Sequence, residues 1–310
     1  MKLVDGTTVS MPDTEKNQQK YRQIGAQRPG LGFPIARVLA IISLATGSIL
    51  NIAIGCYRTS EYALLKLLIP FLELGDVILA DSHFDSYFEF AWLIQRDIDV
   101  VVRMRSARKL YAAGQSGIVR LFKTARPARM DKEEFANVPD FLVLRIVWKN
   151  KLAILTTLID DAKYPDRKIA SLYRERWKIE VDFRSIKSVM QMDILRCKTP
   201  EMIRKEIWIY VLAYNLIRWI MVSAVLHRGT DPRSISFKAT LQALQALGPF
   251  VSSLCSETKR IFYDTVTQII VGPRPYRREP RAIKRRPKNH DLLMVPRWIA
   301  REKLNRVGLS

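Results

Sequence analysis

The sequence predicts an α/β fold in which helices flank a mixed sheet, and two observations lead to this prediction. Short apolar runs at residues 76–80 and 99–104 have the composition of strands that are buried on both faces. Segments of helical composition, at residues 60–74 and 87–94, alternate with these runs, and Pro70 should bend the first of them. The resulting order suits a five-stranded central sheet with helices on both faces.

The uncharged segment at residues 38–56 is long enough to span a bilayer, and the alternative interpretation is a pair of buried strands. A Thr-Gly-Ser turn at residues 46–48, together with Asn51 and Gly55, interrupts the segment, and its β-branched content suits buried strands. We therefore predict a β-hairpin. The first apolar residues run directly into Asp5, so we expect no secretory signal, no membrane partner and a cytoplasmic location.

The predicted order is divided by a stretch of different character. Residues 106–160 contain short strand-like runs separated by turns, which predicts a β-rich insertion between the strands of residues 1–105 and the helices of residues 161–227. Residues 228–310 should add two helices and a basic tail, because the last 39 residues hold twelve Lys and Arg against three acids, with five prolines. We therefore expect four parts: the first part of the core, the insertion, the core helices and a C-terminal extension.

The net charge of the chain indicates which class of molecule it binds. The chain has 51 Lys and Arg against 30 Asp and Glu, a formal net charge of +21. A protein this basic repels itself unless it meets a polyanion, and nucleic acid is the usual one. A membrane surface or an RNA-rich assembly would fit the charge equally well.

The scattered cysteines and histidines exclude several kinds of metal site. Cys56, Cys197 and Cys255 form neither a disulfide framework nor a zinc-binding spacing, which favours a reducing cytosol. The three histidines are also far apart in the chain. Any metal should therefore be a hard cation that is bound by carboxylates.

The most specific pattern lies in a predicted helix at residues 167–190. Tyr173, Arg176, Glu180 and Lys187 follow one another at spacings of three, four and seven residues. At 3.6 residues per turn they share an arc of about 60° and extend over about 20 Å. Without further information, an ordinary surface ion pair between Arg176 and Glu180, with a solvated Lys187, explains these residues equally well.

The spacing Tyr-x2-Arg-x3-Glu-x6-Lys resembles the signature of the IS-four-type insertion-sequence transposases, which belong to the DDE superfamily. The family's first acid lies in an Asp-Gly-Thr strand, which Asp5 and the residues after it match. Its second acid follows a short apolar strand, as Asp81 does, and a basic strand end comes soon after, as at Arg103 and Arg105. The resemblance covers nearly the whole chain. It implies an RNase H-like mixed sheet.

The resemblance also implies the site. Three acids would be catalytic and would hold Mg²⁺ or Mn²⁺ in a two-metal arrangement: Asp5, Asp81 and Glu180. The DNA-binding residues would come from the signature helix and from the basic strand end: Tyr173, Arg176, Lys187, Arg103 and Arg105. Arginine suits a phosphate because its planar fork matches the geometry of the oxygens.

The implied function is that of a DNA transposase, which cleaves double-stranded DNA at transposon ends and joins those ends to target DNA. The family acts as a dimer on paired ends, so we expect a homodimer on DNA, in the bacterial cytoplasm beside the nucleoid. One departure matters: the family normally has a substantial region before the first acid, whereas Asp5 stands almost at the start here.

Two other functions stay open at this stage. A catalytically inactive remnant that only binds DNA would result if the acids do not assemble. An RNase H-like nuclease or resolvase would keep the acids without needing Tyr173 and Arg176. Among residues, Asp85 is the alternative to Asp81, and Trp148 has the right type to stack on a flipped base. Asp182 is a poor substitute for Glu180, because it lies about 200° round the helix.

Overall fold

The computed structural model describes residues 1–25, 30–105, 115–128, 130–149, 152–226, 230–251 and 256–272, with a few isolated positions outside these ranges. The expected basic tail, from residue 272 onward, therefore lies almost entirely outside the described residues.

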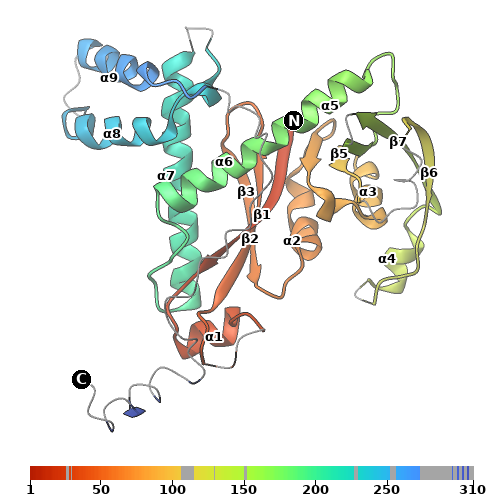
Figure 1. The fold of residues 1–310 in the computed structure, drawn as a ribbon, viewed down its shortest axis with the longest axis horizontal. Helices are drawn as coiled ribbons and strands as arrows, with labels where there is room; N and C mark the ends of the chain where they lie inside the picture. Colours follow the sequence, from red (N-terminus) through yellow and green to blue (C-terminus); the bar gives the residue numbers. More distant parts are fainter. Residues whose placement is uncertain are drawn as a thin grey trace.

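An eight-stranded mixed sheet forms the centre of the protein, with the strand order β3-β2-β1-β4-β5-β8-β7-β6 (Figure 1). β1 is antiparallel to β2, which is antiparallel to β3, whereas β4 and β5 run parallel to β1. The strands are β1 (Lys2–Ser10), β2 (Ile35–Ser43), β3 (Ile49–Cys56), β4 (Val77–Ala80), β5 (Asp99–Arg103), β6 (Gly117–Phe122), β7 (Phe141–Lys149) and β8 (Leu152–Thr156).

The predicted RNase H-like mixed sheet with flanking helices and a β-rich insertion is confirmed, with one correction to its size. The core strands β1 to β5 form the expected five-stranded unit. The insertion strands were expected to interrupt the order, but they continue the same sheet, because β8 pairs antiparallel with β5 and carries β7 and β6 beyond it. The edge of β5, which would otherwise expose unpaired backbone groups, is thereby covered.

The helices begin and end where local chemistry predicts. The Ser60 side chain accepts a hydrogen bond from the Ala63 amide at 3.2 Å and caps α2, and the helix gives way at Leu68 to a 3₁₀ turn that contains Pro70. The predicted bend near Pro70 is therefore confirmed. The helices are α1 (Glu15–Tyr21), α2 (Glu61–Leu68), α3 (Tyr87–Ile94), α4 (Lys132–Ala136), α5 (Asp166–Arg174), α6 (Lys178–Arg184), α7 (Pro200–Val225), α8 (Phe237–Val251) and α9 (Ser256–Gln268).

Alternation along the strands divides the core between the two faces of the sheet. Leu3 and Leu79 belong to one buried cluster, which includes residues of α5, α6 and α7. Val4 and Ile78, their neighbours in sequence, belong to a second cluster with α2 and α3. Because successive strand residues point to opposite faces, odd-numbered positions in β1 and β4 face α5 and α6.

The uncharged segment at residues 38–56 forms the β2–β3 hairpin, as predicted, and Gly47 adopts φ 77° in its turn. α7, by contrast, has 26 residues and is long and apolar enough to cross a membrane by length and composition. Ile207 and Tyr214 of α7 are buried in the first cluster, whereas Trp219 of the same helix is exposed.

A buried acid ties α6 to its surroundings. Asp182 is only 1% exposed, and its two oxygens accept hydrogen bonds from Arg218 at 2.6 Å and from Arg233 at 2.7 Å. The Tyr214 hydroxyl accepts a hydrogen bond from Arg218 at 2.8 Å and lies 2.9 Å from the Gly47 carbonyl oxygen. The site of a Cβ atom on Gly47 would lie 2.5 Å from Arg233, so only glycine fits this turn. Asp182 therefore joins α6, α7 and the hairpin.

Replacing Asp182 should destabilise the protein strongly. Asp182→Asn leaves the nearly buried guanidinium groups of Arg218 and Arg233 without a counter-charge, and breaking such a pair costs about 3 kcal/mol or more. Urea unfolding measures the loss. Glu201→Gln is the control, since Glu201 pairs with Lys205 on the surface and its replacement should have little effect on stability. Equal losses in the two variants would contradict a special role for Asp182.

Candidate functional site

Two of the predicted acids and one predicted cation lie in a row across the sheet. β1 and β4 pair in parallel with Leu3 beside Leu79, and two residues further along each strand come Asp5 and Asp81. The register of β4 with β5 brings Arg103 level with Asp81 in the same way. All three residues share the face of Leu3 and Leu79, which α5 and α6 cover.

The signature helix places its charged residues over Asp5. Arg176 lies in a 3₁₀ turn between α5 and α6, and Glu180 lies in α6. The Arg176 Nη1 atom is 3.3 Å from Oδ2 of Asp5, and Nη2 is 3.0 Å from Oε1 of Glu180. The Arg176 side chain is only 17% exposed. The pair with Glu180 is therefore part of a half-buried bridge that also reaches β1, and an ordinary surface pair does not describe it.

The surroundings of Asp5 raise the pKa of its carboxyl. Burial raises the pKa of its carboxyl to about 6, the Gly6 amide that it binds at 2.8 Å lowers the pKa, and the neighbouring negative charges of Asp81 and Glu61 raise it again. Arg176 offsets only part of this effect. Burial and the neighbouring acids together therefore make ionisation of Asp5 unfavourable.

Asp81 lies at the end of β4 and is engaged by His83. Its Oδ1 atom accepts a hydrogen bond from the His83 amide at 2.8 Å, which caps a short 3₁₀ turn, and its Oδ2 atom lies 2.9 Å from His83 Nδ1. This hydrogen bond and the charge of Asp81 raise the pKa of His83. Sequence reasoning missed His83, although its place two residues after a candidate acid was a usable signal.

The loop after Asp81 is held by Arg105. The Arg105 guanidinium donates to the carbonyl oxygens of Ser82 at 2.8 Å and His83 at 2.6 Å. Asp85, the alternative to Asp81, is 2% exposed and accepts a hydrogen bond from the Arg105 amide at 2.7 Å. Asp85 is therefore a buried part of this loop, and Arg105 has a holding role besides the predicted contact with DNA.

Tyr173 belongs to the same site, whereas Lys187 does not. Tyr173 is 8% exposed, and burial raises the pKa of its hydroxyl, with smaller effects from Arg176 and Asp81. Lys187 is half-buried in the π-helical segment Ser185–Val189, where burial lowers its pKa and Asp193 raises it. The Asp193 carbonyl oxygen accepts from the amide of Ser10, at the far end of β1. The segment that follows Lys187 therefore lies against the far end of β1.

The aromatic residues of the insertion are not where residue type suggested. Trp148 packs against the cluster on the opposite face of the sheet from the acids. Phe122 and Phe141 pair across β6 and β7, and they share the face of Val147, which is the face of the acids. Both are exposed, and Arg120 lies 5.3 Å from the Phe141 ring centre.

The carboxylate oxygens of the three candidate acids are suitable ligands for a hard divalent cation, although they do not form a complete set of metal ligands in this arrangement. Within the ranges that the structure describes, no group of three or more His, Cys, Asp or Glu side chains lies close enough to hold a metal ion. The Arg176 guanidinium lies between Asp5 and Glu180 in this arrangement. Carboxylate oxygens with an excess of negative charge are what Mg²⁺ and Mn²⁺ prefer.

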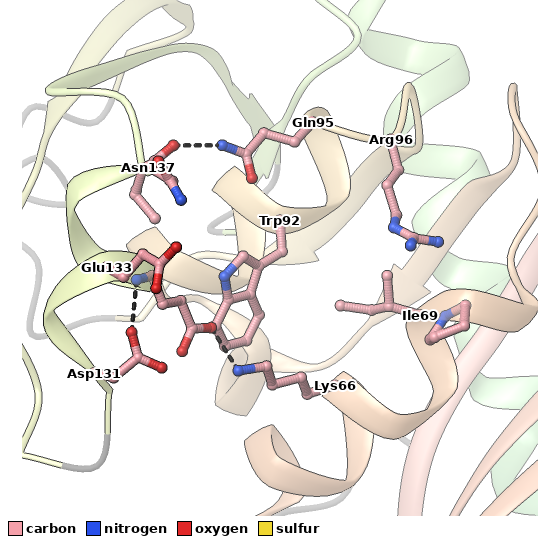
Figure 2. Close-up of a pocket in the computed structure, with 11 residues that line it drawn as sticks. Lys66, Ile69, Trp92, Gln95, Arg96, Asp131, Glu133 and Asn137 are labelled. Carbon is pink, nitrogen blue, oxygen red and sulfur yellow. Dashed lines mark hydrogen bonds and ion pairs between the residues drawn. The ribbon is translucent and has the colours of Figure 1, made fainter.

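A cavity lies elsewhere on the described surface (Figure 2). It has a volume of about 640 Å³, and it is lined by residues of α2, α3 and α4 and of the turns beside these helices. Figure 2 shows the indole of Trp92 near its middle, with Lys66 beside it. Lys66 forms an ion pair with Glu134, with 2.6 Å between Nζ and Oε1. None of the three acids lines this cavity. The candidate site therefore lies outside this cavity, at the end of the sheet that carries Asp5 and Asp81.

Comparisons with known proteins agree with the expected family. The family described as "Transposase DDE domain" matches residues 2–216. Transposase InsG for insertion sequence element IS4, from Escherichia coli strain K12, is 28% identical over 309 residues, which cover 92% of this chain and 67% of that protein. The transposase for insertion sequence element IS421, from Escherichia coli, is 35% identical over 83 residues, 26% of this chain and 21% of that protein. A cryo-EM structure of the piggyBac transposase synaptic complex with hairpin DNA aligns with a TM-score of 0.46 at 13% identity, covering 89% of this chain and 58% of that one.

Removing the charge of Asp5 should stabilise the metal-free protein. The pKa of this carboxyl is higher in the fold, about 6, than its ordinary value of 3.8, so ionisation opposes folding. The penalty is absent below about pH 4, grows between pH 4 and 6, and is complete above pH 6. Asp5→Asn should therefore raise the free energy of unfolding at pH 8 by up to about 3 kcal/mol.

Urea unfolding in EDTA at pH 8 and pH 4 tests this prediction. The gain should disappear at pH 4, and Asp140→Asn, which changes a 95% exposed carboxylate, should have little effect at either pH. A loss of stability in Asp5→Asn at pH 8 would show that Arg176 balances the carboxylate fully.

Proposed function

Because the chain belongs to the DDE transposase family, and to its IS4 type, we propose that it cleaves DNA at transposon ends and joins those ends to target DNA. The observation that carries this proposal is the Arg176 bridge. Its guanidinium binds Asp5 from β1 and Glu180 from α6, and the charge of Asp81 acts on Asp5 at the same end of the sheet.

In this proposal Asp5, Asp81 and Glu180 are the catalytic acids and hold Mg²⁺ or Mn²⁺. Two bound cations would activate the attacking oxygen and stabilise the leaving oxygen of the phosphodiester. The chain contributes the charge that attracts them: Asp5 is raised in pKa by burial and by its acidic neighbours, and it gains most from a nearby cation. His83 orients Asp81 through two hydrogen bonds.

Arg176 has two successive roles in this proposal. In the free protein its guanidinium neutralises Asp5 and Glu180. When cations take over that task, the same planar fork becomes available to a DNA phosphate, which it can bind through two parallel hydrogen bonds. Tyr173 and Arg103 lie beside it and would bind the DNA near the cleaved bond, while Arg105 and Lys187 would contact the strand further out.

Double-stranded DNA as the partner is also supported by the charge. A net charge of +21 on 310 residues suits a polyanion, and contacts between basic side chains and phosphates add affinity without sequence choice. In a bacterial cell that partner is the nucleoid DNA in the cytoplasm.

The test uses DNA that carries the sequences flanking the gene, labelled at the ends, with Mn²⁺ and a supercoiled target plasmid. Cleavage at the element boundary followed by joining to the plasmid supports the proposal. Cleavage without joining would identify a nuclease or resolvase. Binding without cleavage would identify a remnant that only binds DNA.

Glu180→Gln should abolish cleavage and leave DNA binding nearly unchanged, because glutamine keeps the size of the side chain and removes a metal ligand. A metal ion contributes several kcal/mol to such a transition state, so the cleavage rate should fall by about a thousandfold or more. Rates are measured by gel and affinities by fluorescence anisotropy. Glu175→Gln is the matched control, since Glu175 lies one turn earlier and pairs with Lys178. Equal loss of binding and cleavage would indicate a structural role for Glu180.

We also propose that two copies act together on DNA. Two free copies with this charge repel each other, whereas DNA between them supplies the opposite charge. Mass photometry in moderate salt should therefore find monomers without DNA and two copies per pair of DNA ends. A stable dimer without DNA, or a single copy on paired ends, would contradict this prediction.

A further inference from the structure

Glu61 brings a fourth carboxylate to the acids from the opposite face of the sheet. It is the first residue of α2, which packs on the face of Val4 and Ile78, whereas Asp5 points to the other face. Its charge nevertheless acts on both Asp5 and His83. The carboxylate therefore reaches the end of the sheet where these residues lie.

Gly6 makes room for this carboxylate. A Cβ atom on Gly6 would lie 2.7 Å from Oε1 of Glu61 and 3.0 Å from its Cδ atom, closer than real side chains approach each other. Gly6 does not have a positive φ, so its backbone does not require glycine. The reason for glycine directly after Asp5 is thus the space that the Glu61 carboxylate fills.

Capping alone does not account for Glu61. An acid in the first turn of a helix stabilises the helix through its dipole, and Glu15 in α1 and Glu201 in α7 occupy such places. Each of those two binds a side chain one turn later, Gln19 at 3.2 Å and Lys205 at 2.7 Å. Glu61 has no hydrogen bond or ion pair with any residue that the structure describes, and it extends over Gly6 instead.

We propose that Glu61 is a fourth acid of the metal centre, which approaches a hydrated divalent cation from the α2 side of the sheet. This inference rests on the proposed function. Mg²⁺ and Mn²⁺ keep several of their waters when they bind to proteins, and a half-buried carboxylate that binds no other side chain among the described residues is suited to accept hydrogen bonds from those waters. Glu61 would thereby orient the cation held by Asp5 and Asp81.

The test is the affinity for Mn²⁺ itself, measured on the full chain by isothermal titration calorimetry and by the electron paramagnetic resonance signal of free Mn²⁺. Glu61→Gln should raise the Kd by about tenfold, the size of effect usual for groups that orient metal ligands. Glu201→Gln, which changes an equivalent first-turn acid far from the site, should leave the Kd unchanged. An unchanged Kd in Glu61→Gln would overturn the proposal.

Gly6→Ala gives an independent arm. The added methyl group should displace the flexible end of Glu61 and should raise the Kd for Mn²⁺ in the same direction as Glu61→Gln. In a Glu61→Ala background, Gly6→Ala should have no further effect, because no carboxylate is left to displace. Additive effects in this double-mutant cycle would mean that Gly6 acts on the metal centre in some other way, and would count against Glu61.

Asp81→Asn separates this inference from the proposed function. If Asp81→Asn removes Mn²⁺ binding and Glu61→Gln does not change it, the metal centre stands and Glu61 is not part of it. If Asp81→Asn leaves Mn²⁺ binding intact, the proposed metal centre itself is wrong. Unfolding in EDTA should be alike for the wild-type protein and Glu61→Gln, which excludes a general loss of structure as the cause of a weaker Kd.

Discussion

The geometry of the site depends on the buried carboxylate of Asp182. Because its two oxygens bind Arg218 and Arg233, helix α6 cannot rotate without exposing two buried guanidinium groups. Glu180 precedes Asp182 by two residues, which places it on nearly the opposite side of the helix, toward Arg176 and β1. The pair of ion bridges thus fixes the direction in which Glu180 points. A residue with no chemical role of its own decides where a proposed catalytic residue lies.

The parallel strands supply the other half of the arrangement. Neighbouring parallel strands bring residues at equal register to the same edge, so Asp5 and Asp81 come together although they are far apart in the chain. The pKa of Asp5 is raised to about 6 mainly because the carboxyl is buried, and the negative charge of Asp81 adds to this effect. The ionised Asp5 carboxylate therefore lowers the stability of the fold, which is typical of sites that bind an ion.

Much of this arrangement could be predicted from the sequence, and the rest depends on contacts that patterning does not contain. Asp81 was suggested by its place after an apolar strand and Asp5 by the Asp-Gly-Thr pattern of the family, while the hairpin was predictable from its turn chemistry. The continuation of the sheet through β8 was not, since alternation gives the face of a strand and not its neighbour. Glu61 lay outside the motif, and only the space above Gly6 connects it to Asp5. Trp148 was suggested by residue type, while the parity of β7 directs it to the other face.

The Arg176 bridge connects the free protein with the proposed active one. A group of acids without a cation would repel one another and loosen the end of the sheet, and the guanidinium prevents this by lying between Asp5 and Glu180. Any cation that enters must displace it, and the displaced guanidinium is half-buried and needs a new anion. In the proposed function, a DNA phosphate at the same place would supply that anion. Cation and DNA should therefore bind cooperatively. A cation that binds alone would leave the Arg176 guanidinium without an anion, and DNA that binds alone would leave the acids without the guanidinium.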